Sequence, residues 1–150
     1  MQRGVVKMPK TKKPLTKKGK KQKAWNIFSK YIRTRDCLKT SKFPDCGKCI
    51  TCGKFFPIQE LQAGHAISGR NNSILFDEEL VNAQCRGCNG YGNGRYADYS
   101  LWFIKKYGQD KWEEKVRLSH ELVPDLDYDE IYEKYKKKYD KLMEKWGDFK

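Results

Sequence analysis

The chain has 150 residues, of which 38% are hydrophobic and 34% are charged. This length suits one compact domain with tails rather than two full domains. Aromatic residues make up 13% of the chain, which argues against a wholly disordered protein. No stretch has the roughly 20 apolar residues that a membrane span needs, and the N-terminus lacks the apolar segment of a signal peptide. We therefore expect a cytoplasmic protein.

The net charge of +13 is concentrated at the start of the chain. Residues 1–40 contain 14 Lys or Arg and one acid, Asp36, whereas the remaining residues contain 18 of each sign. A basic arm on a neutral body is typical of a protein that binds a polyanion. DNA or RNA is the first candidate, because neutralised phosphates release counterions. An anionic membrane is a weaker candidate, since the arm has no apolar face, and a solubilising tail is the alternative without a partner.

Residues 1–23 are rich in lysine and contain no aromatic residue, so we expect a disordered arm. Residues 24–36 are predicted to form a helix, with Trp25, Phe28 and Ile32 on one face. A loop is expected over residues 37–48. The lysines of the arm that we expect to contact DNA are Lys12, Lys13, Lys17, Lys18, Lys20 and Lys21.

The remainder of the chain predicts short strands followed by helices, which indicates an α+β fold. Strands are expected over residues 61–67 and near residues 74–76, with a connection or a helical turn over residues 77–81. Helices are expected over residues 95–107, 109–121 and 127–146. We expect one domain over residues 24–121, and a linker with an amphipathic C-terminal helix over residues 122–150. The apolar stripe of this last helix is expected to pack on the body or on a second subunit.

Two Cys-x-x-Cys pairs, Cys49/Cys52 and Cys85/Cys88, predict a zinc site. Disulfides are rare in cytosolic proteins, and two such turns can supply the four thiolates of a closed tetrahedral shell. Such a zinc ion would be structural and would fasten residues 49–88 into one unit. Buried or free thiols and a redox dithiol are the alternatives. Cys46 also lies three positions before Cys49, so a Cys46/Cys49 pair is a second register. With the Cys49/Cys52 pair, Cys37 and Cys46 would be spare, and whether either joins the zinc site stays open.

His65 is the candidate catalytic residue, because it lies between the two cysteine pairs at the predicted end of a strand. A neutral imidazole can take a proton from an attacking water. Asn89 and Asn93, four positions apart on an expected helix, offer carbonyl oxygens to a catalytic Mg²⁺ or Mn²⁺ ion. Asn82 is expected to orient the His65 loop. The alternative is a loop histidine among turn asparagines, which tolerate left-handed backbone angles.

Several segments together resemble the phage NinG (Rap) recombination proteins. These are residues 25–36 (WNIFSKYIRTRD), 49–54 (CITCGK), 63–65 (AGH), 76–78 (FDE), 84–89 (QCRGCN) and 92–93 (GN), with Tyr96. The resemblance covers about residues 22–104. The basic arm and the last helix lie outside it.

The resemblance implies an endonuclease related to the HNH, or His-Me finger, enzymes, with a zinc-stapled ββα-metal core and selectivity for branched recombination DNA. It implies that His65 is the general base and that the four paired cysteines bind zinc. Asn89 falls where many HNH proteins have a third histidine, and Asn93 matches the family's Gly-Asn. The sequence departs at Gly64, where many HNH sites have an acid, and at Leu80, where related sequences often have an asparagine.

Two functions fit these observations. One is a Mg²⁺- or Mn²⁺-dependent endonuclease that cuts Holliday junctions or D-loops, with phosphate contacts from Arg70, Arg86 and Arg95. The other is a non-catalytic zinc module that binds DNA and assists recombination or replication, in which His65 is structural. RNA binding is a third interpretation. A homodimer would suit a two-fold junction, and host or phage recombination proteins are expected partners.

Overall fold

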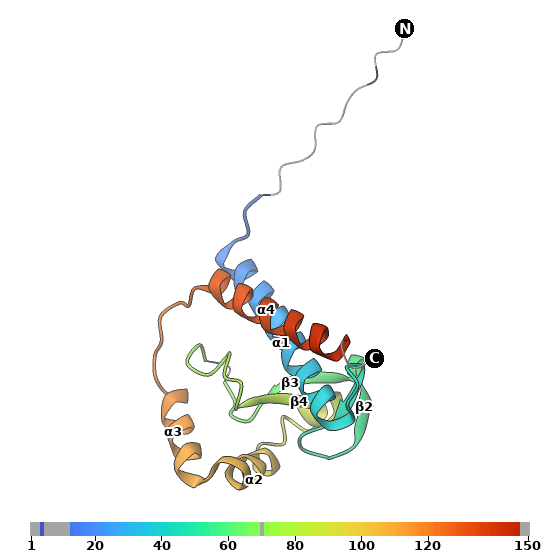
Figure 1. Ribbon diagram of the computed structural model, residues 1–150. Coiled ribbons are helices and arrows are strands. Elements are labelled where there is room, and N and C mark those ends of the chain that lie inside the picture. The colour runs from blue at the N-terminus through green and yellow to red at the C-terminus, as the bar shows by residue number, and fades with distance from the viewer. Residues whose placement is uncertain (1–3, 5–12, 70, 148–150) are drawn as a thin grey trace.

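The computed structural model describes residue 4, residues 13–69 and residues 71–147. Helices and two small antiparallel sheets form the fold, which agrees with the α+β prediction. The elements are α1 (Lys17–Ser41), β1 (Cys46–Lys48), β2 (Phe55–Pro57), η1 (Ile58–Glu60), β3 (Leu61–His65), β4 (Val81–Cys85), η2 (Gly87–Tyr91), α2 (Tyr96–Tyr107), α3 (Gln109–Ser119) and α4 (Tyr128–Gly147). Figure 1 shows α1 and α4 together on one side of the β3–β4 sheet, with α2 and α3 on the other. Over the described ranges, no helix combines the length and apolar character needed to cross a bilayer.

Helix α1 is longer than the sequence predicted. It starts at Lys17, because the Thr16 hydroxyl accepts a hydrogen bond from the Gly19 N–H at 3.1 Å and caps the first turn. The stretch 17–23, expected in the disordered arm, is therefore helical, and the expected loop begins only after Ser41. The part of the arm before residue 13, apart from Gly4, lies outside the described residues.

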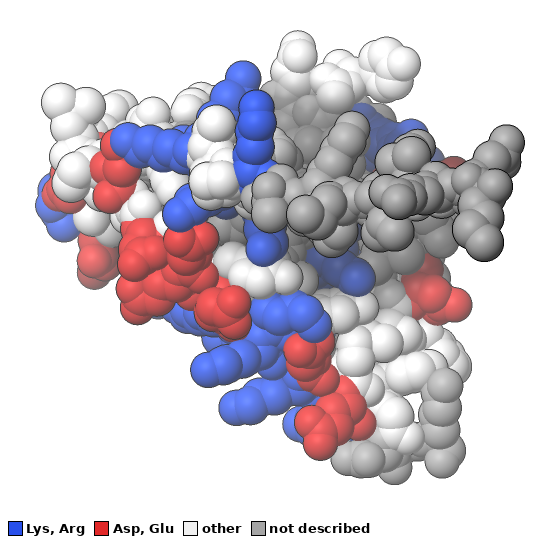
Figure 2. Space-filling model, turned by 90° about the horizontal axis from the view of Figure 1, so that it is seen from above, with Lys and Arg blue, Asp and Glu red and all other residues white. Residues whose placement is uncertain are grey.

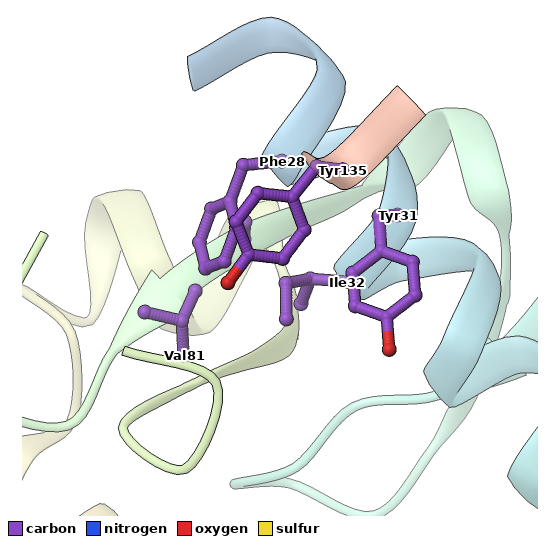
Figure 3. Close-up of a cluster of buried hydrophobic side chains, with 6 residues drawn as sticks. Phe28, Tyr31, Ile32, Val81 and Tyr135 are labelled. Atoms are coloured by element: carbon purple, nitrogen blue, oxygen red, sulfur yellow. The ribbon is translucent and has the colours of Figure 1, made fainter. Parts of the chain in front are cut away.

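Helix α4 packs on the body, which was one of the two predicted alternatives. It runs parallel to α1: near its start Lys20 pairs with Asp129 at 2.9 Å, and further along Lys30 lies over the Tyr139 ring at 4.6 Å. The rings of Phe28 and Tyr135 meet edge to face, with centroids 4.7 Å apart. Figure 3 shows this core, in which α1 and α4 side chains meet Val81 of β4. Burial of these aromatic rings stabilises the packing of α1 along α4.

The sheet that carries His65 pairs β3 with β4, with Leu61 opposite Cys85 and His65 opposite Val81. Strand β3 lies within the predicted strand, but its partner is not at residues 74–76. That segment forms a turn in which Ile74 and Leu75 are buried. The Asp77 carboxylate accepts hydrogen bonds from the N–H groups of Glu79 and Leu80, which holds the chain in a turn until β4 begins.

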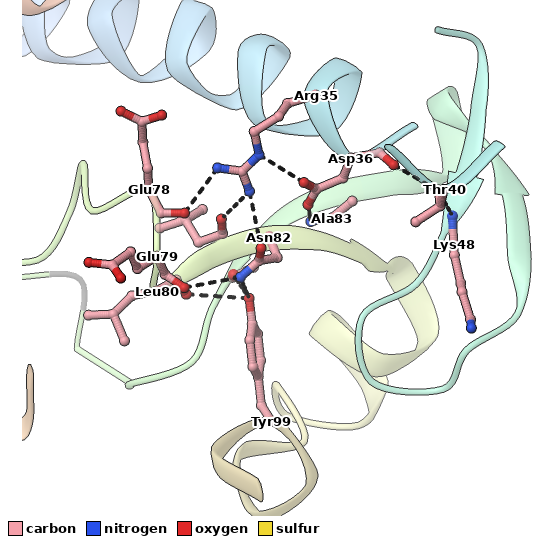
Figure 4. Close-up of polar contacts among 12 residues, drawn as sticks. Arg35, Asp36, Thr40, Lys48, Glu78, Glu79, Leu80, Asn82, Ala83 and Tyr99 are labelled. Atoms are coloured by element: carbon pink, nitrogen blue, oxygen red, sulfur yellow. Dashed lines mark hydrogen bonds and ion pairs between the residues drawn. The ribbon is translucent and has the colours of Figure 1, made fainter. Parts of the chain in front are cut away.

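The Arg35–Asp36 ion pair on α1 supplies hydrogen-bond partners to backbone groups at the edge of β4 that faces away from β3. Arg35 donates to the carbonyl oxygens of Glu78 and Val81 at 3.0 and 3.1 Å, and Asp36 accepts from the Ala83 N–H at 2.7 Å. The Ala83 carbonyl accepts from the Ile50 N–H at 2.9 Å. Figure 4 shows how the two α1 side chains face the strand. A two-stranded sheet would otherwise leave these backbone groups unpaired in the interior.

We predict that Asp36→Ala lowers the free energy of unfolding by about 3 kcal/mol, because it leaves the buried Arg35 guanidinium and the Ala83 N–H without their carboxylate partner. The Asp36 and Arg35 side chains are 10% and 16% exposed. Urea denaturation followed by circular dichroism measures the change. Asp45→Ala, at an exposed position, is the control and should change the value by less than about 0.5 kcal/mol. Equal effects of the two substitutions would contradict this role of Asp36.

Candidate functional site

The two Cys-x-x-Cys turns bring four sulfur atoms together. The Sγ atoms of Cys49, Cys52, Cys85 and Cys88 all lie within 4.8 Å of one another, and those of Cys52 and Cys85 are 3.9 Å apart. A tetrahedral zinc ion with bonds of about 2.3 Å places its sulfur ligands roughly 3.8 Å apart. The four cysteines could therefore hold a metal ion such as zinc, in a closed shell with no position for a reacting water.

Backbone N–H groups donate hydrogen bonds to sulfur atoms of the cluster and favour the thiolate form of Cys49. The N–H of Cys85 donates to the Cys49 sulfur at 3.3 Å, and the N–H of Cys88 donates to the Cys85 sulfur at 3.4 Å. Burial alone would raise the pKa of Cys49, but hydrogen bonds from the backbone of Cys52 and Cys85 lower this pKa to about 6. A cysteine that ionises readily is a good zinc ligand.

The structure distinguishes the two cysteine registers. Cys46 lies on β1 and is not a member of the group that the four sulfurs form. Cys37 is fully buried on α1 and is likewise outside the group of four sulfurs. The geometry therefore favours the Cys49/Cys52 pair, with Cys46 and Cys37 spare.

Beside this cluster, a pocket of about 400 Å³ lies along β3. Three groups of residues line it: α1 residues on one wall, residues of β3 and its flanks, and residues around the second cysteine pair. Its polar and aromatic lining residues include Trp25, Ser29, Arg33, Gln59, Gln62, His65, Arg86, Asn89 and Tyr96. No Asp or Glu is among the described residues that line it. The described lining thus combines two arginines and a histidine with no carboxylate, which favours an anionic ligand.

His65 ends β3 and is held in a fixed orientation. Its ring stacks on Trp25 with centroids 5.4 Å apart and an angle of 16°, and only 7% of the residue is exposed. The Nε2 atom lies 3.1 Å from the Leu75 carbonyl oxygen. A hydrogen bond to this carbonyl requires the proton on Nε2, which leaves the lone pair on Nδ1. The turn that precedes β4 therefore fixes the orientation of the His65 ring.

Asn89 follows the second cysteine pair and reaches the same pocket. Its amide nitrogen donates to the Gln62 side chain at 2.8 Å. Its Oδ1 atom would lie 3.1 Å from a Cβ added to Gly64, and the Gln84 Oε1 atom would lie 2.1 Å from it. Gln84 therefore fills the space that a side chain at position 64 would need. This close approach explains why glycine, rather than an acid, precedes the histidine.

Arg33 and Arg35 are two positions apart on α1 and have different environments. Arg35 is bound to Asp36, and although burial alone would lower its pKa, the Asp36 carboxylate raises it. Arg33 lines the pocket, and its described hydrogen bond is from Nε to the Ser29 carbonyl at 3.2 Å. Burial lowers the pKa of Arg33, and no carboxylate pairs with it among the described residues. A half-buried guanidinium without an acidic partner is prepared to bind an anion.

Two of the predicted asparagines do not line the pocket. Asn82 is buried between Arg35 and Tyr99: it accepts from Arg35 at 3.0 Å and donates to the Tyr99 hydroxyl at 3.1 Å. It thus connects α1 with α2, and Tyr99 in turn donates to the Gly64 carbonyl beside His65. The expectation that Asn89 and Asn93 share one helix face was wrong. Helix η2 ends at Tyr91, and Asn93 is exposed with a φ of 51°.

The residues that were expected to contact DNA lie in different environments. Arg86 lines the pocket and donates to the Gln59 carbonyl at 3.0 Å, whereas Arg95 pairs with Asp98 at 3.6 Å and does not line it. Lys17 pairs with Asp125, Lys20 pairs with Asp129, and Lys21 donates to Asn72 at 2.9 Å. Lys13 and Lys18 are exposed. Lys12 and Arg70 lie outside the described residues.

Sequence reasoning did not assign Trp25, Arg33 or Gln84 to the site. Trp25 was predicted to belong to the apolar face of its helix, which is also where it lies, beside His65. One signal for Arg33 was available: Trp25, Ser29 and Arg33 recur every four positions, so they share one face of α1. Nothing in the sequence indicates that Gln84 lies against Gly64, since this contact depends on the register of β3 and β4.

We predict that the purified, reduced protein contains one zinc ion per chain and that Cys52→Ser loses it, because three thiolates cannot close the tetrahedral shell. Cys46→Ser is the matched control, since Cys46 is half-buried like Cys52 but lies outside the cluster. Mass spectrometry of metals and a melting curve measure the outcome. Zinc lost from Cys46→Ser and retained by Cys52→Ser would reverse the assignment of the ligands.

The chain matches the family model of the bacteriophage Lambda NinG protein over residues 2–145. The match is wider than the resemblance, because it also takes in the basic arm and most of α4. A search of curated proteins found no match, and a search of solved structures found none either. Because the matched span includes the cysteine cluster, the pocket and both long helices, the chain belongs to the bacteriophage Lambda NinG protein family.

Proposed function

We propose that the protein is a metal-dependent DNA endonuclease that acts on branched recombination intermediates. Membership of the NinG family implies a function related to phage recombination. The observation that carries the proposal is the pocket itself, where His65 and Asn89 share one cavity with Arg33 and Arg86. A strand that ends in a histidine, a second strand, and a cysteine pair that leads into Asn89 follow the plan of an HNH-like site.

The reaction is hydrolysis of a phosphodiester bond. His65 takes a proton from water through the ring nitrogen that carries the lone pair, and the water oxygen forms a bond to phosphorus. The bond from phosphorus to the leaving oxygen breaks, and this oxygen takes a proton from solvent. Stacking on Trp25 and the contact with Leu75 fix the ring, so that the base needs little reorientation before the reaction.

The oxygen atoms near Gly64 favour a hard cation. Gln84 Oε1 is buried without a hydrogen-bond partner among the described residues, and it lies with Asn89 Oδ1 around the position of a missing Cβ. Asn89 would hold a Mg²⁺ or Mn²⁺ ion, with Gln84 as an adjacent oxygen donor. Such an ion would stabilise charge that develops on the phosphate and the leaving oxygen. Two neutral amides form a weak site, so the ion would bind together with a DNA phosphate.

Arg33 and Arg86 supply the positive charge that the pocket needs to hold a phosphate. Arg33 lies on α1 and Arg86 lies between the paired cysteines, so the two guanidiniums approach the cavity from different elements. Guanidinium groups bind phosphate oxygens with two parallel hydrogen bonds. In this position they would hold the scissile phosphate against His65 and stabilise the charge of the transition state.

Other basic residues would add affinity without sequence preference. Lys13 and Lys18 are exposed, and together with other basic residues that precede α1 in the sequence they would contact phosphates, which predicts a steep salt dependence. The face in Figure 2 carries acidic and basic groups side by side, so it is a poor surface for DNA. We propose that DNA lies instead across the pocket.

We predict that His65→Ala reduces the cleavage rate of a four-way junction by about 10²- to 10⁴-fold in Mg²⁺ or Mn²⁺, because the general base is lost. Binding of the junction and zinc content should be retained. Gel analysis of a junction, a D-loop and a linear duplex measures the rates, with EDTA as the metal-free reference. The control is His120→Ala, because His120 is the other histidine of the chain and is exposed. This variant should cut the junction at the wild-type rate.

The same experiment tests the alternative function. A wild-type protein that binds junctions tightly but cuts no substrate would be a non-catalytic DNA-binding module. Its support is the absence of carboxylates among the described residues of the pocket lining, together with glycine at position 64.

We predict that Arg33→Ala lowers kcat/KM for junction cleavage by about 10²-fold, since it removes a cation that contacts the reacting phosphate. Arg33→Lys should recover part of this loss, because it keeps the charge but not the planar fork. The control is Arg117→Ala, since Arg117 is exposed on α3 and pairs with Glu121. Single-turnover kinetics separates binding from chemistry. Equal rates for Arg33→Ala and Arg117→Ala would exclude Arg33 from the site.

A further inference from the structure

A second pocket, of about 770 Å³, lies where the C-terminal ends of α1 and α4 come together. Four apolar side chains line it, two aliphatic and two aromatic: Leu38, Leu142, Phe43 and Trp146. Phe43 is 57% exposed although it is one of the largest apolar side chains of the protein. The pocket falls within the size range of sites that bind small molecules or single peptide side chains.

Positive charge surrounds these apolar groups. Lys39, Lys42 and Lys145 also line the pocket, and no Asp or Glu is found among its described lining residues. Arg35 completes the lining, but its guanidinium is bound to Asp36 and to backbone carbonyls. Lys106 of α2 lies beside Lys39, and burial together with this neighbouring charge lowers the pKa of Lys106. Like charges have thus been gathered at this end of the molecule, where a ligand with negative charge would relieve their repulsion.

The lining separates two kinds of anionic ligand. A nucleic-acid strand binds through phosphates on an open basic groove and through bases stacked on flat aromatic faces. Here half of the apolar lining is aliphatic and the pocket is concave, which suits an inserted hydrocarbon or aromatic side chain. Acidic groups beside that side chain would reach the lysines at the rim. This combination fits an acidic peptide with an apolar anchor.

We infer that this pocket, formed by Leu38, Phe43, Leu142 and Trp146 and bordered by three lysines, is a docking site for an acidic peptide segment of a partner protein that carries Leu or Phe as its anchor. The charge complementarity of the lysine rim identifies the class of partner. The site is separate from the His65 pocket, because Arg35 and Leu38 project from another face of α1 than Trp25, Ser29 and Arg33. The docking site therefore does not depend on nuclease activity.

The test measures binding of a fluorescein-labelled peptide of aspartates that ends in Leu-Phe, by fluorescence anisotropy on the full chain. Wild type should bind this peptide, and a peptide with Ser-Ser in place of Leu-Phe should bind at least about tenfold more weakly. Phe43→Ala should weaken binding by about tenfold, because it removes part of the apolar lining. Phe55→Ala is the matched control, since Phe55 is also 57% exposed but lies on β2.

A second pair of variants tests what the lysine charges contribute to peptide binding. Lys42→Glu combined with Lys145→Glu should weaken peptide binding by more than about tenfold. Lys141→Glu, at an exposed position on α4 outside the pocket lining, should leave it within about twofold. Zinc content and circular dichroism confirm that each variant is folded.

Three outcomes would overturn the inference. Peptide binding that Phe43→Ala and the double lysine variant leave unchanged would place the peptide elsewhere. Binding of a labelled oligothymidylate, lost in the same variants while the peptide does not bind, would make the pocket a single-stranded DNA site. A peptide that binds only after the chain is shortened to end at Gly147 would identify the last three residues of this chain as the occupant.

Discussion

The ion pair between Arg35 and Asp36 is the interaction on which the rest of the structure depends. The β3–β4 sheet has only two strands, and a sheet of this size is marginally stable unless something packs against it or completes its hydrogen bonds. Asp36 accepts from Ala83, and Arg35 donates to Val81 and to Asn82, so adjacent side chains of α1 serve β4 as a third strand would. Because β4 ends at Cys85, the same contacts help to hold the second cysteine pair against the first.

This arrangement makes α1 the common support of the molecule. The middle of the helix packs on α4 through Phe28 and Tyr31, and further along the helix Arg35 and Asp36 hold β4. A third set of residues, spaced by four, forms one wall of the His65 pocket. Because α1 contacts neighbours on most of its surface, its buried residues do not form a single apolar stripe. The apolar periodicity of the sequence therefore predicted only the central part of the helix. A metal ion held by the four clustered cysteines would fasten the two Cys-x-x-Cys turns to each other, next to Cys37 of α1 in the same buried cluster.

Local features were predictable from the sequence, and features that depend on distant contacts were not. The Cys-x-x-Cys spacing acts within one turn, so the four clustered cysteines followed from the sequence. Helices α2, α3 and α4 are marked by periodic apolar residues and by Gly108 between the first two, and their predicted bounds are close to those observed. The second strand was predicted near residues 74–76, because Ile74 and Leu75 are apolar enough for a strand. Instead, the Asp77 carboxylate accepts hydrogen bonds from the N–H groups that follow it, and the chain forms a turn before β4 begins. The start of α1 was missed because lysines without an apolar pattern resemble a disordered arm until α4 lies beside them.

Gly64 shows how far the residues around His65 constrain the chemistry. An acid at this position would bring a carboxylate to the cation, but the Gln84 side chain occupies that space and its Oε1 atom would collide with a Cβ there. Gln84 cannot easily withdraw, since its amide nitrogen donates to Thr51 and to the Gly94 carbonyl. The pocket therefore keeps neutral oxygens beside two arginines, and its charge is positive before any ion binds. Under the proposed function, a site of this kind would attract the phosphate first and the cation with it, so catalytic metal affinity should belong to the complex with DNA rather than to the free protein.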